Sequence, residues 1–241
     1  MKRDLVTIYS ICYNEEVMLP HFIKHYRVNF PNCKIILYDN ESIDNTVKIA
    51  LDNDCEVITY KTNGYNSIID KLELKNNCWK NAETDWVFVV DIDEFCQINQ
   101  NELIQCELEE FNIIQFKGFQ MVSNIEDIYN FKIEDIRMGT EHHYEDKSTL
   151  FNKKYIKEIN YTPGAHSCHP IYDNLKISEK QFILKHYKFI NIDYVINRYN
   201  EINNRIPSIS KKNGWSSHYN KTKQDILKMY SELIKKSKEV D

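Results

Sequence analysis

Four strand-like segments alternate with helix-like segments over the first part of the chain, and this alternation constrains the fold most. The strand-like segments, rich in β-branched and aromatic residues, are residues 5–11, 34–39, 55–60 and 86–91. Apolar residues recur at helical spacing between them, and Pro20 suits the first turn of a helix. Such an alternation predicts βαβ units around a mainly parallel sheet. The apolar run at 86–90 predicts helices on both faces of that sheet.

After residue 91 the pattern changes to short extended segments and then to helices. The extended segments predict antiparallel or mixed strands added to the sheet, at residues 112–119, 149–152 and 181–187. We expect a helix over 191–206, ended by Pro207, and an amphipathic helix over 222–237. The chain is therefore expected to form one domain, with an α/β part in residues 1–190 and a helical extension in residues 191–241.

Composition and charge exclude several classes of protein. The net charge is −5, and the basic residues cluster only near the end of the chain, so we expect no nucleic-acid partner. No apolar run approaches the roughly 20 residues of a membrane span, and the N-terminus lacks the apolar core of a signal peptide. The seven cysteines form no C-x-x-C pair, which argues against a disulfide framework. We expect a cytoplasmic protein without a transmembrane segment.

Polar residues follow three of the four strand-like segments. They are Cys-Tyr-Asn-Glu-Glu at 12–16, Asp-Asn-Glu-Ser-Ile-Asp at 39–44 and Asp-Ile-Asp-Glu at 91–94. In an open parallel sheet, ligands bind beyond the carboxyl ends of the strands. One such cluster alone is typical of turns and helix caps. Three at the same sheet edge indicate a binding site.

Asp91 and Asp93 flank one residue at the end of a buried strand. Two carboxylates about 4 Å apart repel each other by roughly 4 kcal/mol at an effective dielectric of about 20. A divalent cation removes this penalty, and oxygen ligands suit Mg²⁺ or Mn²⁺. A surface acidic turn is the alternative interpretation.

Three motifs together resemble the GT-A nucleotide-sugar glycosyltransferases: SICYNEE at 10–16, YDNESIDNT at 38–46 and VDIDEF at 90–95. The last is similar to the D-x-D-E-F metal motif of the family 2-like branch. Three later segments of this chain look like the downstream motifs of that branch: DKSTLF at 146–151, GAH at 164–166 and the pair His186 and Tyr187. The resemblance covers residues 5–190. It implies a GT-A fold, which is a Rossmann-like α/β fold with a mostly parallel mixed sheet, helices on both faces and C-terminal helices.

The resemblance implies a metal-dependent hexosyltransferase that moves a sugar from a nucleotide diphosphate, preferably a UDP-sugar, to a hydroxyl of a glycan, lipid-linked or protein acceptor. The cofactor would be Mn²⁺ or Mg²⁺. The metal ligands would be Asp91, Asp93 and His186, with His218 as a rival of His186. Asp91 would lie nearer the ribose or a metal-bound water. The donor would be bound by ten residues: Cys12, Tyr13, Asn14, Glu15, Asp39, Asn40, Asp91, Ile92, Lys147 and His166.

Inverting transfer requires a carboxylate that takes the proton of the acceptor hydroxyl. Asp146 is the predicted base, with its neighbour Glu145 as the second catalytic residue and the pair Glu134 and Asp135 as the alternative. For Lys147, an exposed surface lysine remains the alternative to a diphosphate contact. Residues 207–221, which include Gly214, Trp215 and Tyr219, predict either a mobile lid over the donor or an ordinary exposed loop.

Two other functions fit part of the pattern. Haloacid-dehalogenase-like phosphatases also present a D-x-D motif after an apolar strand and would use Asp91 and Asp93. That family requires Thr or Val two residues after the second Asp, where this chain has Phe95. A non-catalytic nucleotide-sugar-binding module is the other alternative. Phosphate release from phosphomonoesters would support the first, and nucleotide binding without turnover would support the second.

Overall fold

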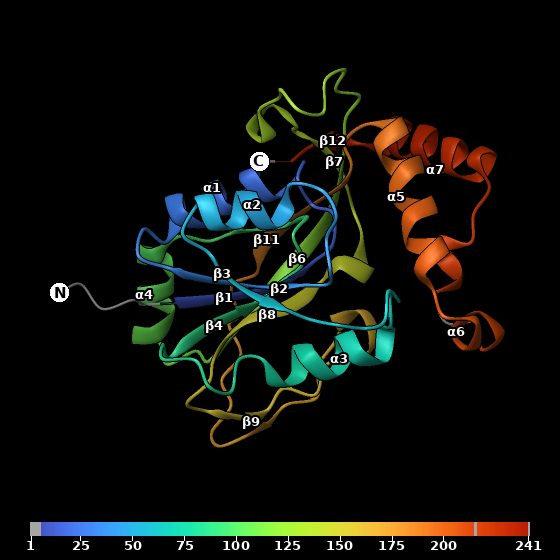
Figure 1. The fold of residues 1–241 in the computed structure, drawn as a ribbon. Coiled ribbons are helices and arrows are strands. Elements are labelled where there is room, and N and C mark those ends of the chain that lie inside the picture. Colours follow the sequence, from blue (N-terminus) through green and yellow to red (C-terminus); the bar gives the residue numbers. More distant parts are fainter. Residues whose placement is uncertain (1–5, 215, 241) are drawn as a thin grey trace.

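The structure is a computed structural model that describes residues 6–214 and 216–240. Its main sheet has ten strands, eight of which follow the order β12-β7-β6-β8-β4-β1-β2-β3 (Figure 1). The half formed by the first four strands of the chain is parallel. These strands are β1 (Val6–Cys12), β2 (Lys34–Asp39), β3 (Glu56–Thr59) and β4 (Trp86–Val89).

The second half of the sheet is mostly antiparallel. β8 (Lys147–Asn152) joins the two halves because it pairs antiparallel with both β4 and β6 (Ile113–Val122). β11 (Phe182–Phe189) runs parallel to β6 and antiparallel to β5 (Glu94–Gln97). The remaining strands are β7 (Met138–Glu141), which lies between β6 and the edge strand β12 (Lys238–Glu239), and the separate pair β9 (Ile156–Glu158) and β10 (Ile171–Tyr172).

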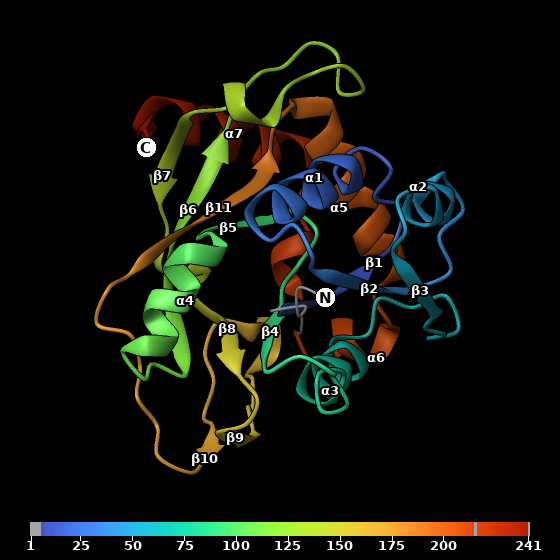
Figure 2. The ribbon, with the colours of Figure 1, turned by 90° about the vertical axis from the view of Figure 1, so that its left-hand side faces the viewer.

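Helices cover both faces of the parallel half (Figures 1 and 2). α1 (Leu19–Asn29) and α2 (Thr46–Asp52) lie on one face, and α3 (Ile68–Asn77) lies on the other. The side chains of β4 alternate accordingly: Trp86 and Phe88 join the core cluster that contains α1, whereas Val87 and Val89 pack in the cluster with Trp79. The near-continuous apolar run of β4 is explained by this burial on both faces.

The remaining helices are α4 (Gln100–Leu108) and a C-terminal group of three. This group consists of α5 (Ile192–Arg205), the short α6 (Ser208–Lys212) and α7 (Lys223–Lys236), and it lies at one end of the sheet (Figure 1). Single 3-10 turns are formed by Ile133–Asp135, His143–Glu145, Pro163–Ala165 and Ser217–Tyr219. No helix in residues 6–214 and 216–240 has the length and apolar character needed to cross a bilayer.

The structure confirms the expected α/β architecture, with a parallel half, appended antiparallel strands and C-terminal helices. Leu5, the expected start of the first strand, lies outside the described residues. The expectation that residues 207–221 form a loop is wrong in part, because α6 and a 3-10 turn occupy much of this segment. Pro207 ends α5 and precedes α6 directly, which suits its fixed φ and missing N–H. Trp215, expected to stack on a sugar, lies outside the described residues.

Candidate active site

The predicted acidic residues lie at the edge where the parallel strands end. The register of β1 and β2 aligns their last residues. β4 is followed by a short turn that carries Asp91 and Asp93 and leads into β5. β11 pairs antiparallel with β5 and sets His186 opposite Glu94. This pairing brings a histidine from far along the chain to the acidic turn.

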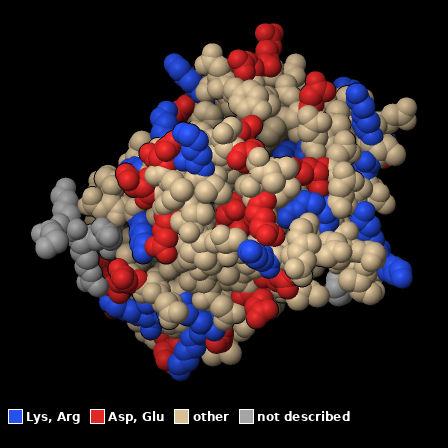
Figure 3. Space-filling model, viewed as in Figure 1, with Lys and Arg blue, Asp and Glu red and all other residues tan. Residues whose placement is uncertain are grey.

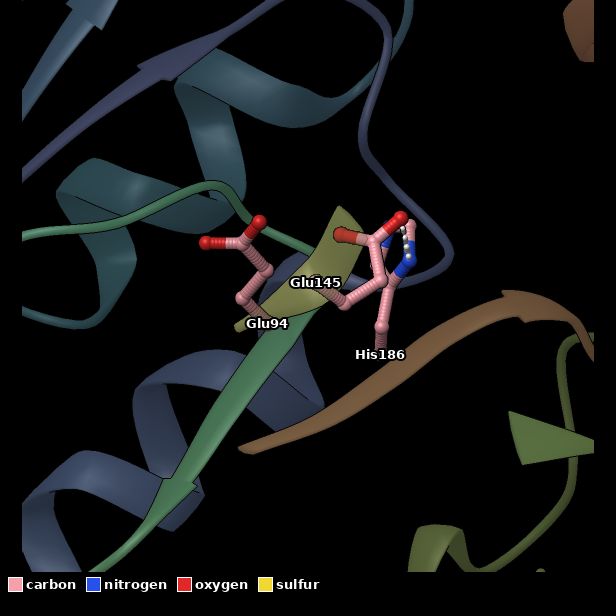
Figure 4. Close-up of side chains that lie close together, drawn as sticks. All are labelled: Glu94, Glu145 and His186. Atoms are coloured by element: carbon pink, nitrogen blue, oxygen red, sulfur yellow. Dashed lines mark ion pairs between the residues drawn. The ribbon is translucent and has the colours of Figure 1, made fainter. Parts of the chain in front are cut away.

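His186 lies between two carboxylates. Its Nε2 atom is 3.0 Å from Oδ2 of Asp93. Its Nδ1 atom is 3.3 Å from Oε1 of Glu145, the ion pair marked by the dashed line in Figure 4. Burial alone would lower the pKa of His186, but the two carboxylates outweigh it and raise this pKa well above its usual value. The attraction acts in both directions: despite their burial, Asp93 and Glu145 have pKa values below the usual range beside this histidine.

A buried lysine neutralises the other acidic residues. Lys147 is 5% exposed, and its ammonium group forms an ion pair with Glu94 and lies 3.7 Å from Asp91 and 4.0 Å from Glu145. Lys75 of α3 forms a second ion pair with Asp91 at 2.7 Å. Burial opposes the charge of Lys147, but the surrounding carboxylates raise its pKa. Lys147 is therefore not the exposed lysine of the alternative interpretation.

The residues around His186 suit a divalent cation. Glu94, Glu145 and His186 each offer a ligand atom within 4.8 Å of the others, and Asp93 adds an oxygen in contact with the imidazole. Both oxygens of Glu94 are already engaged, one by a buried lysine and the other by the N–H of Asp91 at 3.1 Å. Asp93, which lies in the acidic turn and contacts Nε2 of His186, is for this reason better placed than Glu94 to share a cation with the imidazole. A set of carboxylates with one imidazole is compatible with Mn²⁺.

Hydrogen bonds of the side chains expected to bind the nucleoside shape the loop after β2 and tie it to the loops after β1 and β3. Asp39 accepts the N–H of Ser42 at 3.2 Å, and the Asn40 amide donates to Thr62 at 2.9 Å. Asn14, in the left-handed region with φ of 51°, accepts the N–H of a β2–α2 loop residue at 2.9 Å. These bonds fix the shape of the edge at which a ligand would bind.

Two residues predicted to contact the donor are buried in the interior. Ile92 is 2% exposed and packs in the main core cluster. Cys12 is also 2% exposed, and its Sγ lies 3.8 Å from Asp39. Burial, reinforced by that carboxylate, raises the pKa of the Cys12 thiol. Neither side chain is open to a ligand, so a contact would have to use the backbone.

Helix α5 covers the residues that follow β1. The Arg198 guanidinium donates to the carbonyl oxygens of Tyr13 and Asn14 at 3.0 and 3.1 Å. It also forms ion pairs with Glu15 and, at 2.6 Å, with Glu201. The side chain of Glu15 is therefore occupied by an arginine, and the helical extension forms one wall of the candidate site.

Glu145 and Asp146 are neighbours with different partners. Asp146 accepts the N–H of Gly118 at 2.7 Å and lies 3.4 Å from Nδ1 of His143. A Cβ atom on Gly118 would lie 2.3 Å from the carbonyl carbon of Glu145, so only glycine permits this close approach. Glu145 therefore reaches His186, whereas Asp146 anchors the segment to β6.

Two further histidines of the sequence analysis do not contact the acidic turn. The His218 ring lies beside that of Tyr219, with 4.1 Å between centroids. The His166 ring is 6.4 Å from that of Tyr144. Of the two rivals for the metal, His186 is the histidine in contact with Asp93.

Several cations that were not predicted from the sequence converge on the acidic residues. Lys71 and Lys75 lie one turn apart on α3, Arg198 comes from α5, and Lys188 follows His186 by two residues on β11. Figure 3 shows acidic and basic side chains side by side near the middle of one face of the molecule. The spacing of Lys71 and Lys75 was a usable signal, because residues four apart share a helix face. Arg198 and Lys188 carry no comparable local signal.

Comparison with known proteins gives the family. The family model described as Glycosyl transferase family 2 matches residues 7–161, which include all of β1 except its first residue, β2 to β9 and the acidic turn. The chain belongs to glycosyl transferase family 2. The expected family and enzyme class are confirmed, and the match decides against the phosphatase alternative.

Individual relatives of this family 2 chain are distant. Protein RfbJ of Shigella flexneri is 25% identical over 83 residues, which cover 34% of this chain and 60% of that protein. The crystal structure of S. aureus TarS 1–349 in complex with UDP-GlcNAc is 14% identical, with a TM-score of 0.42. The alignment covers 94% of this chain and 71% of the TarS chain. The structure of the mannosyltransferase PcManGT from Pyrobaculum calidifontis in complex with GDP-Man and Mn²⁺ is 15% identical, with a TM-score of 0.36. The alignment covers 54% of this chain and 39% of the PcManGT chain.

Proposed function

We propose that this family 2 chain is a metal-dependent glycosyltransferase that moves a sugar from a nucleotide diphosphate, preferably a UDP-sugar, to an acceptor hydroxyl. The observation that carries the proposal is the contact between Asp93 and His186 at the carboxyl edge of the parallel strands. This contact joins two residues of the sequence motifs that lie 93 positions apart. We further propose a cytoplasmic location and a glycan, lipid-linked or protein acceptor.

Basic residues of the site are suited to a diphosphate. Lys71 and Lys75 face Asp91 from α3, and Lys75 contacts it at 2.7 Å. Asp93 and His186 would hold Mn²⁺, which when bound would offset the negative charge that grows on the departing diphosphate. Stabilisation of that charge counts for catalysis because it is larger in the transition state than in the ground state. Asp39, fixed by the N–H of Ser42, would accept a ring N–H of the base.

Glu145 is the better of the two predicted bases. Its carboxylate lies beside His186 and is ionised at neutral pH, because His186 and Lys147 hold the pKa of Glu145 below its usual range despite burial. Asp146 is engaged by a backbone N–H, and Glu134 forms an exposed ion pair with Lys24. In the proposed step the acceptor oxygen bonds to the anomeric carbon, its proton passes to Glu145, and the carbon–oxygen bond to the diphosphate breaks.

Single substitutions of Glu145 and Asp146 distinguish the general base from the residue that anchors the segment to β6. We expect Glu145→Gln to lower kcat about 10³-fold, because general-base assistance typically contributes 10²- to 10⁴-fold. Asp146→Asn keeps the shape of the side chain and should lower kcat less than about tenfold, with its main effect on the melting temperature. Initial rates of sugar transfer and thermal melts of both variants provide the measurement. A larger kcat loss in Asp146→Asn than in Glu145→Gln would reverse the assignment.

The pH dependence of donor binding tests the role of Lys71. Burial lowers the pKa of its ammonium group to about 8, with nearby Lys75 adding to the effect and Asp91 opposing it. Lys71 is therefore charged below pH 8 and loses its proton above it, so donor affinity should fall about tenfold between pH 7 and 9, or about 1.4 kcal/mol. Calorimetric titrations with a nucleotide sugar at both pH values measure this. Lys71→Arg stays charged and should flatten the profile, whereas an equal fall in that variant would refute the role.

The segment 207–221 is proposed to close over the donor. The Lys188 ammonium lies 4.7 Å from the ring centroids of both Tyr199 of α5 and Tyr219 of this segment. The contact with Tyr219 attaches the segment to the strand that carries His186, and the contact with Tyr199 attaches α5 to the same lysine. Closure would exclude water and protect the donor from hydrolysis.

The proposed function is tested by binding and turnover with a panel of donors. Thermal shifts and donor hydrolysis are measured with UDP- and GDP-sugars, each with Mn²⁺ and with EDTA. We expect one nucleotide to stabilise the protein in the presence of Mn²⁺ and to be hydrolysed slowly. Stabilisation that is unchanged by EDTA would contradict metal dependence, and the absence of any nucleotide effect would contradict the proposed function.

A further inference from the structure

Arg205, the last residue of α5, makes an unusually dense set of contacts for a side chain at the end of a helix. Its guanidinium carbon lies 3.2 Å from the centroid of the Tyr13 ring. Its Nη2 atom donates to Oδ1 of Asn40 at 2.6 Å, and its Nε atom donates to the carbonyl oxygen of Gly64 at 3.1 Å. Its own carbonyl oxygen accepts the N–H of Asn66 at 2.7 Å. The side chain therefore stacks and donates at the same time.

These contacts join three separate loops of the parallel half. Tyr13 follows β1, Asn40 follows β2, and Gly64 lies between β3 and α3. Loops after neighbouring parallel strands surround the ligand in sheets of this kind. Tyr13 and Asn40 are also two of the residues that the sequence motifs assign to the donor. One side chain from the helical extension thus ties together the loops expected to enclose the nucleoside.

We infer that Arg205 is the positioning residue of the nucleoside subsite, which makes α5 part of the donor site. Arginine suits the task because its planar guanidinium stacks on an aromatic face while its edge donates to two oxygens. The Tyr13 ring and the Asn40 amide are held in fixed orientations before the nucleotide arrives, which reduces the ordering cost of binding. The inference rests on the proposed function, because it assumes a nucleotide donor.

The contacts of Arg205 predict that its loss weakens binding of one part of the donor and not of the other. Arg205 holds Tyr13 and Asn40, whereas the diphosphate and the cation are assigned to Asp93, His186 and the lysines of α3. Loss of the guanidinium should therefore weaken binding of the nucleoside part and spare binding of the diphosphate part. A general disturbance of the fold would weaken both equally.

The experiment compares the wild-type protein, Arg205→Ala and Arg205→Lys by calorimetry with Mn²⁺ present, using UDP, GDP and inorganic pyrophosphate as probes. For the nucleotide that the wild type prefers, we expect Kd to rise at least tenfold in Arg205→Ala and less in Arg205→Lys. Kd for pyrophosphate should stay within twofold. Arg137→Ala, which removes an exposed arginine paired with Glu239, is the control and should change neither value.

Three results would overturn the inference. They are an unchanged nucleotide Kd in Arg205→Ala, an equal loss for pyrophosphate, and tighter nucleotide binding, which would mean that the guanidinium competes with the base. If Arg205→Ala does not fold, Arg205→Gln replaces it, since it keeps much of the length of the side chain and removes the stacked guanidinium, and the same nucleotide-selective loss is expected. A wild-type protein that binds neither nucleotide would refute the proposed function instead.

Discussion

Asp93→Asn is expected to lose transfer activity by at least about 10³-fold while the protein remains folded. Asparagine keeps the size of the side chain but removes the charge that faces His186 at 3.0 Å. The proposed cation would lose the charged ligand that the acidic turn supplies. A 10³-fold loss of rate corresponds to about 4 kcal/mol of transition-state stabilisation. Initial rates with Mn²⁺ measure it. The Mn²⁺-dependent thermal shift should disappear in parallel.

The matched control for this variant is Asp173→Asn, which removes an exposed carboxylate paired with Lys157. It should keep full activity and the full response to Mn²⁺. Asp93→Asn with wild-type activity would contradict the proposed site. So would a variant that is inactive yet still shows the wild-type response to Mn²⁺.

Lys147→Met is expected to lower the free energy of unfolding by about 3 to 5 kcal/mol. The lysine and its partner Glu94 are both almost completely buried, and removing one partner leaves an uncompensated charge in the interior. The effect should be largest near neutral pH, where Glu94 would have to take up a proton. Urea denaturation followed by tryptophan fluorescence gives the free energy. The double variant Lys147→Met with Glu94→Gln should recover part of the loss.

Lys48→Met on α2 is the control, since it breaks an exposed ion pair with Asp52. Surface pairs of this kind contribute about 0.3 to 0.5 kcal/mol. A loss of less than about 1 kcal/mol in Lys147→Met would show that the buried pair does not stabilise the fold. A double variant less stable than Lys147→Met would argue against the uncompensated charge as the cause.

The sequence was informative where local patterns determine structure. Strand β4 could be predicted because both of its faces are buried, and the acidic turn after it follows from the carboxyl-edge rule for parallel strands. His186 could be proposed from its motif, but the antiparallel pairing of β11 with β5 brings it to Asp93, and no local pattern encodes that pairing.

The residues that sequence reasoning missed owe their position to tertiary contacts. Arg198 and Arg205 lie on an amphipathic helix that could have been placed on any exposed sheet edge. The choice between Glu145 and Asp146 depended on a 3-10 turn and on Gly118, whose missing side chain allows Glu145 to approach β6. Neighbouring acids in a sequence carry no information about which of them faces a site.

The most direct test of the proposed site is a crystal grown with manganese and a nucleotide sugar, with diffraction recorded at the manganese absorption edge. The account predicts an anomalous peak within bonding distance of both Asp93 and His186, next to the diphosphate. A bound nucleotide with no peak at this position, and with the hydrogen bond from His186 to Asp93 still in place, would contradict it.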